Sequence, residues 1–440
     1  MNLQSYKQLL SEFVRFQSIS TDPNFLPAIE DTVEWLQNLF ENYGFETKIF
    51  PGEKTNPVIF AHYKNPKATQ TVLIYGHYDV QPAQHDEGWD ADPFTLTEKE
   101  GKYIARGVVD NKGQILIHIF TVLNLIKEKK LQYNVKFLIE GNEETSNPEL
   151  SGIMKKNSKL LASDYVLVSD GELVDGKPAI EASLRGGFNL TLQYKTADNN
   201  VHSGIYGGAV PNAAYELTKL ISKLFDKNNS ITVEHFYDNV DDITEEHKKH
   251  TERIAHTSQK LIKHAGMQAH LHEAGHNFYT QTGLRPTLQI TGLKSGYIGN
   301  GYANIIPATA EARINFRLVA SQKPDEVILA FRNFVKKYTP EYVDFTLTTD
   351  GIHNPVKIDI NAPIIQTIKK HLHEAYKDQP VLKYVGGAIP FVGDIKDIFG
   401  INTILVPLAN DDCNMHGANE NFSVDLIQKA LHFSELFFST

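Results

Sequence analysis

The sequence predicts an α/β protein in which a first domain is interrupted by an inserted α+β domain. Up to about residue 183, short apolar strand candidates alternate with amphipathic helices, which is typical of a mostly parallel sheet. From Leu184 onward, alternating strands occur in runs with helices to one side. After residue 353 the first pattern returns. We therefore expect a discontinuous domain of residues 1–183 and 354–440, and an inserted domain of residues 184–353.

The individual elements follow from hydrophobic periodicity. Apolar residues recur every three or four positions in segments that we expect to be helical in the first domain: 4–16, 28–43, 114–130 and 363–376. Short apolar runs predict buried strands there at 45–50, 72–75, 135–139, 165–168 and 403–406. In the inserted domain we expect strands at 188–194, 287–291 and 312–318, with helices at 212–225 and 324–338. Between them, residues 234–276 form a polar, charged and histidine-rich stretch.

Composition limits the class of protein. The 440 residues carry a formal net charge of −10 at pH 7, so the chain has no general basic footprint for nucleic acid or an anionic membrane. The amino terminus lacks the build of a secretory signal, and no apolar run approaches the roughly 18 residues of a membrane span. The single cysteine, Cys413, excludes an internal disulfide and indicates a reducing compartment. We expect a cytoplasmic protein with neither a nucleic-acid nor a membrane partner.

Histidine and carboxylate side chains follow the expected buried strands of the first domain. Strand 72–75 leads to His77, strand 135–139 to Glu144, strand 165–168 to Asp170, and strand 403–406 to His416. Asp110 comes directly before the helix at 114–130. In open α/β sheets, ligands bind at the carboxyl ends of the strands. We therefore expect these five side chains to gather at one edge of the sheet.

Each of these residues could instead be an ordinary surface residue, because acids and histidines cluster in solvated loops. A single such residue would favour a surface position, whereas five at the strand ends of one domain favour a metal site. Two imidazoles with several carboxylates suit Zn²⁺, with Mn²⁺ or Co²⁺ as alternatives. Two divalent ions would bring four positive charges against the three negative charges of the ligands, which favours a bridging hydroxide as nucleophile.

Two further carboxylates lie next to this set. Asp79 is two residues from His77, so on an extended backbone both side chains point to one face, and Asp79 can fix the orientation of the imidazole. Glu143 precedes Glu144, and in an extended segment its side chain points elsewhere. Glu143 is therefore the candidate general base. An ordinary surface acid is the alternative for both.

The motifs around these residues occur in a specific order over nearly the whole chain: GHYDVQP, GVVDNKGQ, EGNEETSNP, SDGE, VHSG and MHGANE. In this order they resemble the dinuclear zinc metallopeptidases that include carnosinase-type dipeptidases, glutamate carboxypeptidase and acetylornithine deacetylase. The resemblance implies that His77, Asp110 and Asp170 hold one ion and that Asp110, Glu144 and His416 hold the other. It also implies a cis Asp110–Asn111 peptide, and matches Glu143 to the general base and Asp79 to the histidine-orienting acid.

The resemblance also assigns the inserted domain as a lid and dimerisation domain. It implies a homodimer in which His202 reaches the partner's active site and polarises the scissile carbonyl; from sequence alone, His202 could equally cap a turn. Arg317 resembles the residue that grips the substrate's free carboxylate, although a surface ion pair is its alternative. Substrate contacts are also implied for Asn304, His353 and the GGAIP loop with Gly387 and Ala388; Ala388 stands where relatives often carry serine.

These observations predict a metal-dependent dipeptidase that hydrolyses small peptides with a free carboxylate, using a water held between two ions and activated by Glu143. The length of the inserted domain resembles the dipeptidase branch more than the shorter-lidded deacetylases. The alternative within the superfamily is an N-acyl amino acid deacylase or amidohydrolase. A catalytically silent metal-binding scaffold is the alternative from another class, and Glu143 beside a full ligand set argues against it.

Overall fold

The computed structural model describes the chain except for residues 265, 270, 388 and 402. The chain divides into two compact units. Unit 1 comprises residues 1–182, 358–383 and 390–440, and unit 2 comprises residues 183–357 and 384–389. The expected inserted domain, 184–353, differs from unit 2 by a few residues at its ends. The larger difference is that 384–389 groups with unit 2, whereas the sequence analysis assigned it to the first domain.

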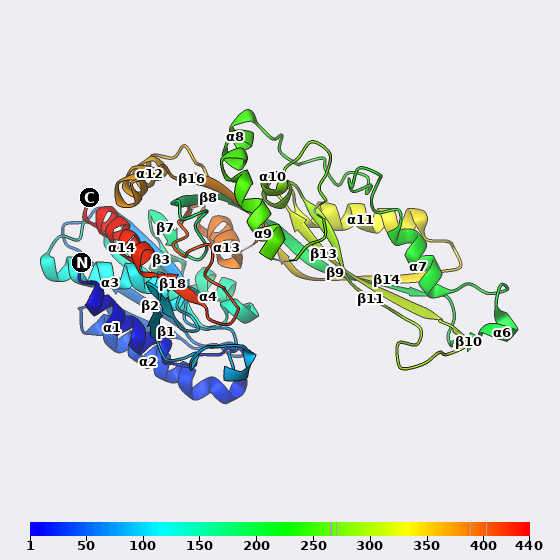
Figure 1. The fold of residues 1–440 in the computed structure, drawn as a ribbon, viewed down its shortest axis with the longest axis horizontal. Helices are drawn as coiled ribbons and strands as arrows, with labels where there is room; N and C mark the ends of the chain where they lie inside the picture. Colours follow the sequence, from blue (N-terminus) through cyan, green and yellow to red (C-terminus); the bar gives the residue numbers. More distant parts are fainter. Residues whose placement is uncertain (265, 270, 388, 402) are drawn as a thin grey trace. The chain divides into compact units, whose positions relative to one another are not determined.

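Unit 1 is built on a six-stranded sheet with the order β1-β2-β6-β3-β7-β17 (Figure 1). Its strands are β1 (Glu46–Phe50), β2 (Val58–Tyr63), β3 (Thr71–His77), β6 (Asn134–Glu140), β7 (Tyr165–Val168) and β17 (Thr403–Leu405). The neighbours β6, β3, β7 and β17 are parallel, whereas β2 runs antiparallel to both β6 and β1. The expectation of a mostly parallel sheet is confirmed. Strand β2 was not among the expected strands.

Helices cover both faces of this sheet. They are α1 (Leu3–Val14), α2 (Leu26–Glu41), α3 (Lys112–Glu128), α4 (Leu150–Lys156), α5 (Ser158–Leu161), α12 (Pro363–Tyr376), α13 (Pro390–Phe399) and α14 (Val424–Ser439). On one face Phe40 of α2 packs against Phe137 of β6, with ring centroids 5.0 Å apart. On the other face Phe391 of α13 stacks on Tyr75 of β3. Strand residues therefore point alternately to two apolar layers, which explains their continuous apolar runs.

Two small three-stranded sheets lie outside the six-stranded sheet. One has the order β18-β5-β4, from β18 (Asn421–Ser423), β5 (Lys102–Ile104) and β4 (Thr97–Lys99). The other has the order β15-β8-β16, from β15 (Val356–Lys357), β8 (Ala179–Leu184) and β16 (Val381–Val385). The pairing of β18 with β5 brings the segment after His416 beside the segment before Asp110.

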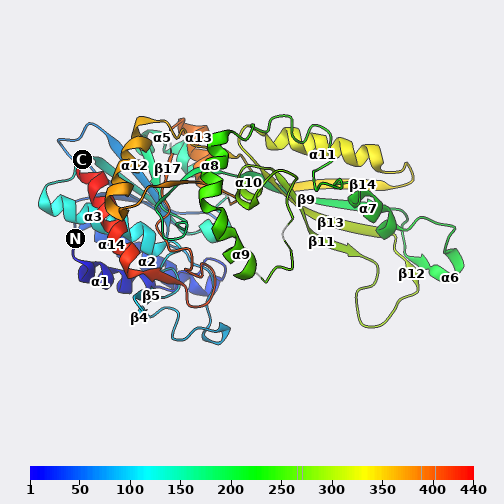
Figure 2. The same ribbon diagram turned by 45° about the horizontal axis from the view of Figure 1, so that its top comes forward.

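Unit 2 contains a four-stranded antiparallel sheet with the order β11-β13-β9-β14. Its strands are β9 (Gly186–Lys195), β11 (Thr287–Ser295), β13 (Thr309–Leu318) and β14 (Asp344–His353). Helices α7 (Ala213–Ile221) and α11 (Pro324–Tyr338) pack on its apolar face, where Phe188, Phe316 and Phe331 form part of the core. The strands of this sheet and helix α11 are seen in Figure 2. The other face carries polar side chains, such as Asn189 and Gln193 of β9 and Glu311 of β13. The remaining elements are α6 (Ser203–Tyr206), α8 (Glu245–Ile254), α9 (Ser258–His264), α10 (Phe278–Gly283) and the strand pair β10 (Val201–His202) and β12 (Ile305–Ile306).

Helix α11 illustrates why the helix boundaries could be predicted. It begins at Pro324, whose fixed φ suits the first helical position and whose missing N–H costs nothing there. Asp325 and Glu326 lie in its first turn and Lys336 and Lys337 in its last, so the charges complement the helix dipole. Among the described residues, no helix is long and apolar enough to cross a membrane.

Candidate metal centre

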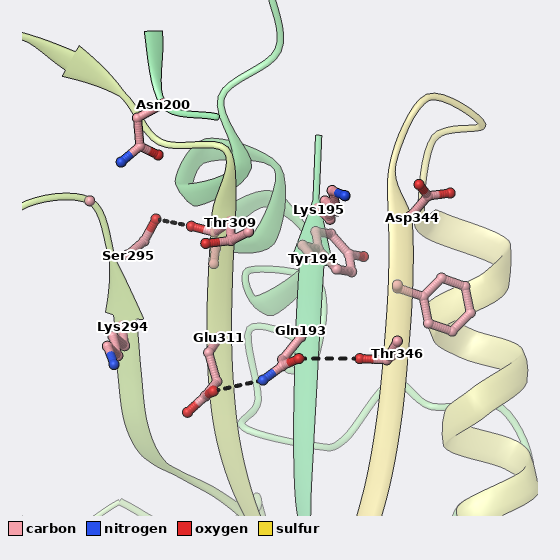
Figure 3. A pocket seen from close by; sticks show the side chains of 13 residues that line it. Gln193, Tyr194, Lys195, Asn200, Lys294, Ser295, Thr309, Glu311, Asp344 and Thr346 are labelled. Carbon is pink, nitrogen blue, oxygen red and sulfur yellow. Dashed lines mark hydrogen bonds between the residues drawn. The ribbon is translucent and has the colours of Figure 1, made fainter. Parts of the chain in front are cut away.

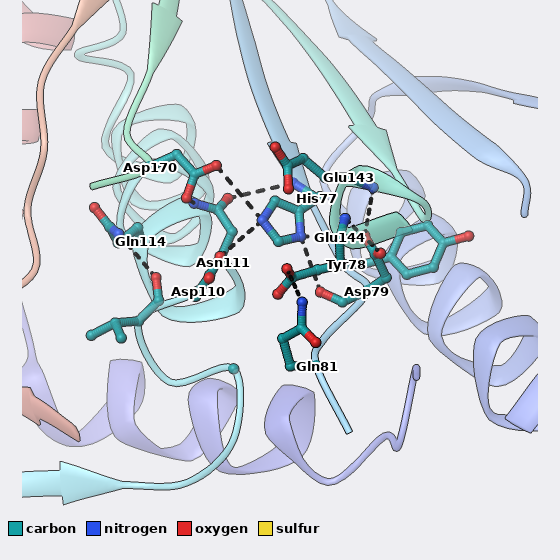
Figure 4. Close-up of polar contacts among 12 residues, drawn as sticks. His77, Tyr78, Asp79, Gln81, Asp110, Asn111, Gln114, Glu143, Glu144 and Asp170 are labelled. Carbon is teal, nitrogen blue, oxygen red and sulfur yellow. Dashed lines mark hydrogen bonds and ion pairs between the residues drawn. The ribbon is translucent and has the colours of Figure 1, made fainter. Parts of the chain in front are cut away.

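Two groups of histidine and carboxylate side chains lie at the carboxyl ends of the parallel strands of unit 1. The first group is His77, Asp110 and Asp170, and the second is Asp110, Glu144 and His416. Within each group the candidate ligand atoms lie within 4.8 Å of one another. Figure 4 shows the first group with Glu144 beside it. The structure thus brings together all five residues that the sequence analysis predicted to hold metal.

The sheet order explains why residues so far apart in the chain meet. Strand β3 lies between β6 and β7 and ends at His77. Glu143 and Glu144 follow β6, and Asp170 follows β7 by two residues. Because the three strands are parallel, their carboxyl ends share one edge. Asp110 reaches the same place from the segment that leads into α3.

Asp110 is the shared member of both groups. Its Oδ1 lies 3.0 Å from Nε2 of His77, and its Oδ2 lies 2.7 Å from Nε2 of His416. The same His77 nitrogen is 3.6 Å from an oxygen of Asp170, and the same His416 nitrogen is 3.3 Å from an oxygen of Glu144. Each oxygen of Asp110 therefore faces a different group, which is the arrangement of a carboxylate that bridges two ions.

Asp79 lies beside His77, where it can orient the imidazole. Nδ1 of His77 is 3.0 Å from the backbone oxygen of Asp79 and 3.3 Å from its carboxylate. Because a carbonyl oxygen can only accept, Nδ1 carries the proton and Nε2 is the nitrogen that faces Asp110 and Asp170. The Asp79 carboxylate also accepts the backbone N–H groups of Glu143 and Glu144, both at 3.2 Å. One buried carboxylate therefore holds the imidazole and both glutamates.

The segment that carries Glu143 and Glu144 is a short 3₁₀ turn, Glu143–Thr145, and not the extended segment that we expected. Hydrogen bonds from the turn to Asp79 favour it over an extended strand end. Glu144 Oε2 accepts a hydrogen bond from Gln81 at 2.6 Å, whereas its Oε1 is buried without a partner. Burial and the neighbouring carboxylates raise the pKa of Glu143 well above its usual range, as expected of a group that exchanges a proton.

The electrostatics of the centre reflect crowded negative charge. Burial, together with the charges of Asp110 and Glu144, raises the pKa of Asp170 to about 7. Hydrogen bonds to Asp110 and Glu144 raise the pKa of His416 to about 10. Burial alone would raise the pKa of Asp110, but hydrogen bonds with His416 and His77 bring it well below its usual value. In the ion-free protein, protons on the imidazoles thus offset the carboxylates.

These residues fit two divalent cations. The donor set combines two imidazole nitrogens with carboxylate oxygens, which suits Zn²⁺ and similar ions. A buried carboxylate oxygen without a donor, Oε1 of Glu144, is costly in the protein alone and would be satisfied by a cation.

Sequence reasoning missed two residues that hold the ligands. Gln81 donates to Glu144, and Nδ2 of Asn111 donates to the Asp170 carboxylate at 3.1 Å and to the Ser169 carbonyl at 2.7 Å. Both lie inside the quoted motifs, so their position next to predicted ligands was the available signal. The peptide between Asp110 and Asn111 is cis, as the resemblance implies.

In unit 2 the predicted carboxylate-binding residues lie around Gly187. Arg317 of β13 and His353 of β14 both pair with this glycine, which has no room for a side chain because a Cβ would lie 2.1 Å from the Phe316 oxygen. His353 Nδ1 bonds the Gly351 oxygen at 2.9 Å, and its Nε2 is buried without a partner. The pKa of His353 is lowered by burial and by the positive charge of Arg317.

Arg185 adds a second guanidinium to this place. Its Nε donates to the Gly386 oxygen at 3.0 Å, and its backbone N–H to the Gly387 oxygen at 3.1 Å. Burial and the nearby Arg317 lower the pKa of Arg185 to about 10. Gly387 thus lies in unit 2 with the arginines, whereas the predicted contact Ala388 lies outside the described residues.

His202 and Asn304 also lie together in unit 2. The Nδ1 atom of His202 accepts the Gly204 N–H at 3.0 Å and caps the short helix α6. The N–H of Ser203 donates to the Asn304 oxygen at 2.9 Å. The turn-capping alternative for His202 is therefore present in the structure, and the exposed side chain leaves the catalytic alternative as a prediction.

A separate hollow of about 440 Å³ in unit 2 contains none of the predicted site residues (Figure 3). Gln193 at its base bonds to Glu311 and Thr346 across three strands, and Ser295 bonds to the Thr309 oxygen. Gln193, Glu311 and Thr346 thus bond to one another, and none of the lining residues belongs to a group that could hold a metal ion.

The chain is similar to known peptidases. The chain is 30% identical over 383 residues to the Beta-Ala-His dipeptidase of Rattus norvegicus, covering 84% of this chain and 76% of that protein. It is 27% identical to the Cysteinylglycine-S-conjugate dipeptidase of Corynebacterium striatum, covering 96% and 92%. The crystal structure of an M20 family metallo-carboxypeptidase from Sulfolobus solfataricus superposes with a TM-score of 0.86 at 28% identity, covering 100% and 99% of the two chains.

The family profile extends through both units. Residues 73–439 match the profile of Peptidase family M20/M25/M40, and this range contains every predicted ligand as well as Asp79, Glu143, His202 and Arg317. The chain belongs to Peptidase family M20/M25/M40.

Proposed function

We propose that this protein is a metal-dependent dipeptidase that hydrolyses small peptides with a free carboxylate. The observation that carries the proposal is Asp110, whose two oxygens face two separate ligand groups with Glu143 close by. Membership of the peptidase family and similarity to proteins named dipeptidases support the same function. A silent scaffold would have no need of a buried acid beside a full ligand set.

Two divalent ions, zinc in the first place with Mn²⁺ or Co²⁺ as alternatives, would be held by His77, Asp110 and Asp170 and by Asp110, Glu144 and His416. When bound, they supply Lewis acidity that polarises the scissile carbonyl and makes water a better nucleophile. The protein's part is to fix the ligands. Asp79 holds His77 in the tautomer that presents Nε2, which is a role that second-sphere carboxylates commonly have.

Glu143 is the proposed general base and acid. Its high pKa means that it gains a proton readily, which suits a group that takes a proton from water and returns it to the leaving amine. Hydrogen bonding of its backbone N–H to Asp79 fixes the start of the turn and so the direction of the side chain.

The free carboxylate of the substrate is the proposed partner of Arg317. Among the described residues, no hydrogen bond or ion pair to an acid is recorded for Arg317 or Arg185, so two neighbouring guanidinium groups lack a counter-charge. His353 is a further proposed contact: Nδ1 donates to the Gly351 carbonyl, so its unpartnered Nε2 would donate to the anion only in the imidazolium form. The Gly387 backbone, Ala388 and Asn304 complete the proposed substrate contacts.

We also propose that unit 2 serves as lid and dimerisation domain of a homodimer in which His202 acts on the partner's substrate. Large apolar side chains are exposed in the segment of His202 and in the loop that leads to β12: Ile205 at 73%, Ile298 at 80% and Tyr302 at 102% of their reference areas. Exposed large apolar side chains are typical of a protein–protein interface. With a single, buried cysteine, we place the enzyme in the cytoplasm.

The test is a substrate panel for the metal-loaded enzyme, with dipeptides, tripeptides, and N-acetyl and N-succinyl amino acids. We expect turnover of dipeptides, and a loss of about 10²–10⁴-fold in kcat for Glu143→Gln with unchanged metal content. Turnover of acyl amino acids without any dipeptide cleavage would replace this proposal by a deacylase. Unchanged activity of Glu143→Gln would exclude the mechanism for either substrate class.

A further inference from the structure

A single buried carboxylate, that of Glu420, holds the backbone that carries Asp110. Its Oε2 accepts the N–H of Gly107 at 2.9 Å, and its Oε1 accepts the N–H groups of Val109 and Asp110 at 2.8 and 3.1 Å. The side chain is fully buried. Three backbone donors in the segment directly before Asp110 therefore end on one residue that lies 310 positions away in the chain.

Arg106 extends this connection to His416. Its Nη1 forms a 2.8 Å ion pair with Oε2 of Glu420, and its Nη2 donates to the His416 carbonyl at 3.2 Å and to the Pro82 carbonyl at 3.3 Å. The guanidinium lies 5.3 Å from the ring centroid of Trp89, so its position is fixed by stacking as well. The Arg106–Glu420 ion pair therefore connects the segment before Asp110 with the segment that carries His416.

The backbone conformation of His416 requires contacts that stabilise it. Its φ is +61°, in the left-handed region that residues with a Cβ rarely adopt. A conformation of this kind persists only where the surroundings enforce it. The hydrogen bond from Arg106 to the His416 carbonyl and the 2.7 Å bond from Gly417 N–H to the Asn414 oxygen are contacts that do so.

We propose that Glu420 is a positioning residue that sets the affinity of the ion site formed by Asp110, Glu144 and His416. This inference rests on the proposed metal-dependent function. Glu420 is not a member of either ligand group, so it acts through the N–H groups of the Asp110 segment and through Arg106. A buried ion pair can often be replaced by apolar residues, but here three backbone N–H groups would be left without an acceptor.

The test substitutes Glu420→Gln, because an amide has one acceptor end and one donor end. In one orientation the glutamine NH₂ group would face the N–H donors of Arg106 and Gly107. In the other orientation it would face the N–H donors of Val109 and Asp110. The matched control is Glu273→Gln in unit 2, where Glu273 forms a similar buried pair with Arg285 (2.6 Å) and accepts the Tyr237 hydroxyl, without contact to a candidate ligand.

The readouts are competitive titration of the ion-free protein with Zn²⁺ against a chromophoric chelator and the visible spectrum of the Co²⁺-loaded protein. For Glu420→Gln we expect one ion to bind about 10- to 100-fold more weakly and the Co²⁺ spectrum to change. For dipeptide hydrolysis at saturating metal, kcat should fall while KM stays unchanged. The Glu273→Gln control should lower Tm and leave the titration and the spectrum as in the wild type.

Wild-type ion affinity and spectrum in a folded Glu420→Gln variant would overturn the proposal and leave Glu420 as a structural ion pair. If Glu420→Gln does not fold, Arg106→Lys decides, because it keeps the charge but loses the fork between Glu420 and His416; normal ion affinity there would equally overturn it. If the wild type binds ions but does not hydrolyse dipeptides, only the proposed substrate class is overturned. A wild type that binds no divalent ion would overturn both proposals.

Discussion

Replacement of the buried His118 should change the pH dependence of the stability of unit 1. His118 lies on α3 with no exposed surface, and its ring nitrogens lie 2.9 Å from the Ser169 hydroxyl and 3.0 Å from the Ser434 hydroxyl. No carboxylate contacts the ring in the structure's described part. Burial alone lowers its pKa to about 3, because no negative charge compensates the loss of water around an imidazolium.

The magnitude follows from the difference between the folded and the unfolded chain. An unfolded histidine has a pKa near 6.5, so between pH 6.5 and about 3 the unfolded chain binds a proton that the folded chain excludes. The stabilisation from a neutral His118 is therefore complete above pH 6.5 and is lost as the pH falls. Between pH 7 and pH 5 this loss amounts to about 2 kcal/mol, because one pKa unit corresponds to about 1.4 kcal/mol.

The assay is denaturant unfolding of the wild type and of His118→Gln at pH 7, 6 and 5, with chelator present so that metal binding does not contribute. Both tryptophans of the chain, Trp35 and Trp89, lie in unit 1, so their fluorescence reports on this unit alone. Glutamine cannot take up a proton but can still bond to both serines. We expect the wild type to lose about 2 kcal/mol more than the variant between pH 7 and pH 5. Parallel losses in the two proteins would refute the reasoning.

Three other predictions concern the proposed site. Arg317→Lys should raise KM for dipeptides about tenfold or more with little change in kcat, because a bidentate contact with the carboxylate becomes a single one. Dipeptide amides, which lack the carboxylate, should be cleaved equally by both proteins. An equal rise in KM for the amides would speak against carboxylate binding. Mixing His202→Ala with Asp110→Ala subunits, each inactive alone, should restore about a quarter of wild-type activity. Random pairing makes about half of the dimers heterodimers, and each heterodimer has one intact site out of two. No recovery in a mixed dimer would exclude action in trans. Chelator treatment should lower the Tm of unit 1, and Zn²⁺ should restore it, because each bound ion adds about 2.7 kcal/mol to the free energy of unfolding at a hundredfold excess over Kd. A Tm that does not respond to Zn²⁺ would contradict a folded, ion-stabilised centre.

The sequence was sufficient to predict that strands alternate with helices in the first domain and which side chains follow the ends of the strands. The parallel sheet could be predicted because buried strands such as β3 and β6 read as continuous apolar runs, and the candidate ligands follow them directly. The interior strand β2 was not predicted. Strand β2, with the sequence VIFAHY, is flanked by Asn-Pro dipeptides at 56–57 and 65–66 but does not alternate strictly, and its place is set by its pairing with β1 and β6.

What could not be predicted depends on contacts between distant segments. Glu420 was visible only as the last letter of MHGANE, because its partners Arg106 and Gly107 lie more than 310 residues before it. The grouping of 384–389 with unit 2 has the same origin, since Arg185 binds the Gly386 carbonyl across 201 positions. The 3₁₀ turn at Glu143 likewise depends on Asp79, which lies 64 residues earlier. No local pattern encodes such pairings.

The charge of the centre links its stability to its chemistry. Asp79, Asp110, Glu143, Glu144 and Asp170 bring five carboxyl groups into one buried region with only two imidazoles. Without ions, the charge must be offset by protons, which is why the pKa values of His416 and Asp170 are raised. Two divalent cations would offset four of the five negative charges and release those protons, whereas Glu143 belongs to neither ligand group and is buried, which raises its pKa. The same crowding that would make the ion-free centre costly therefore supports the proposal that Glu143, among these five acids, acts as the base.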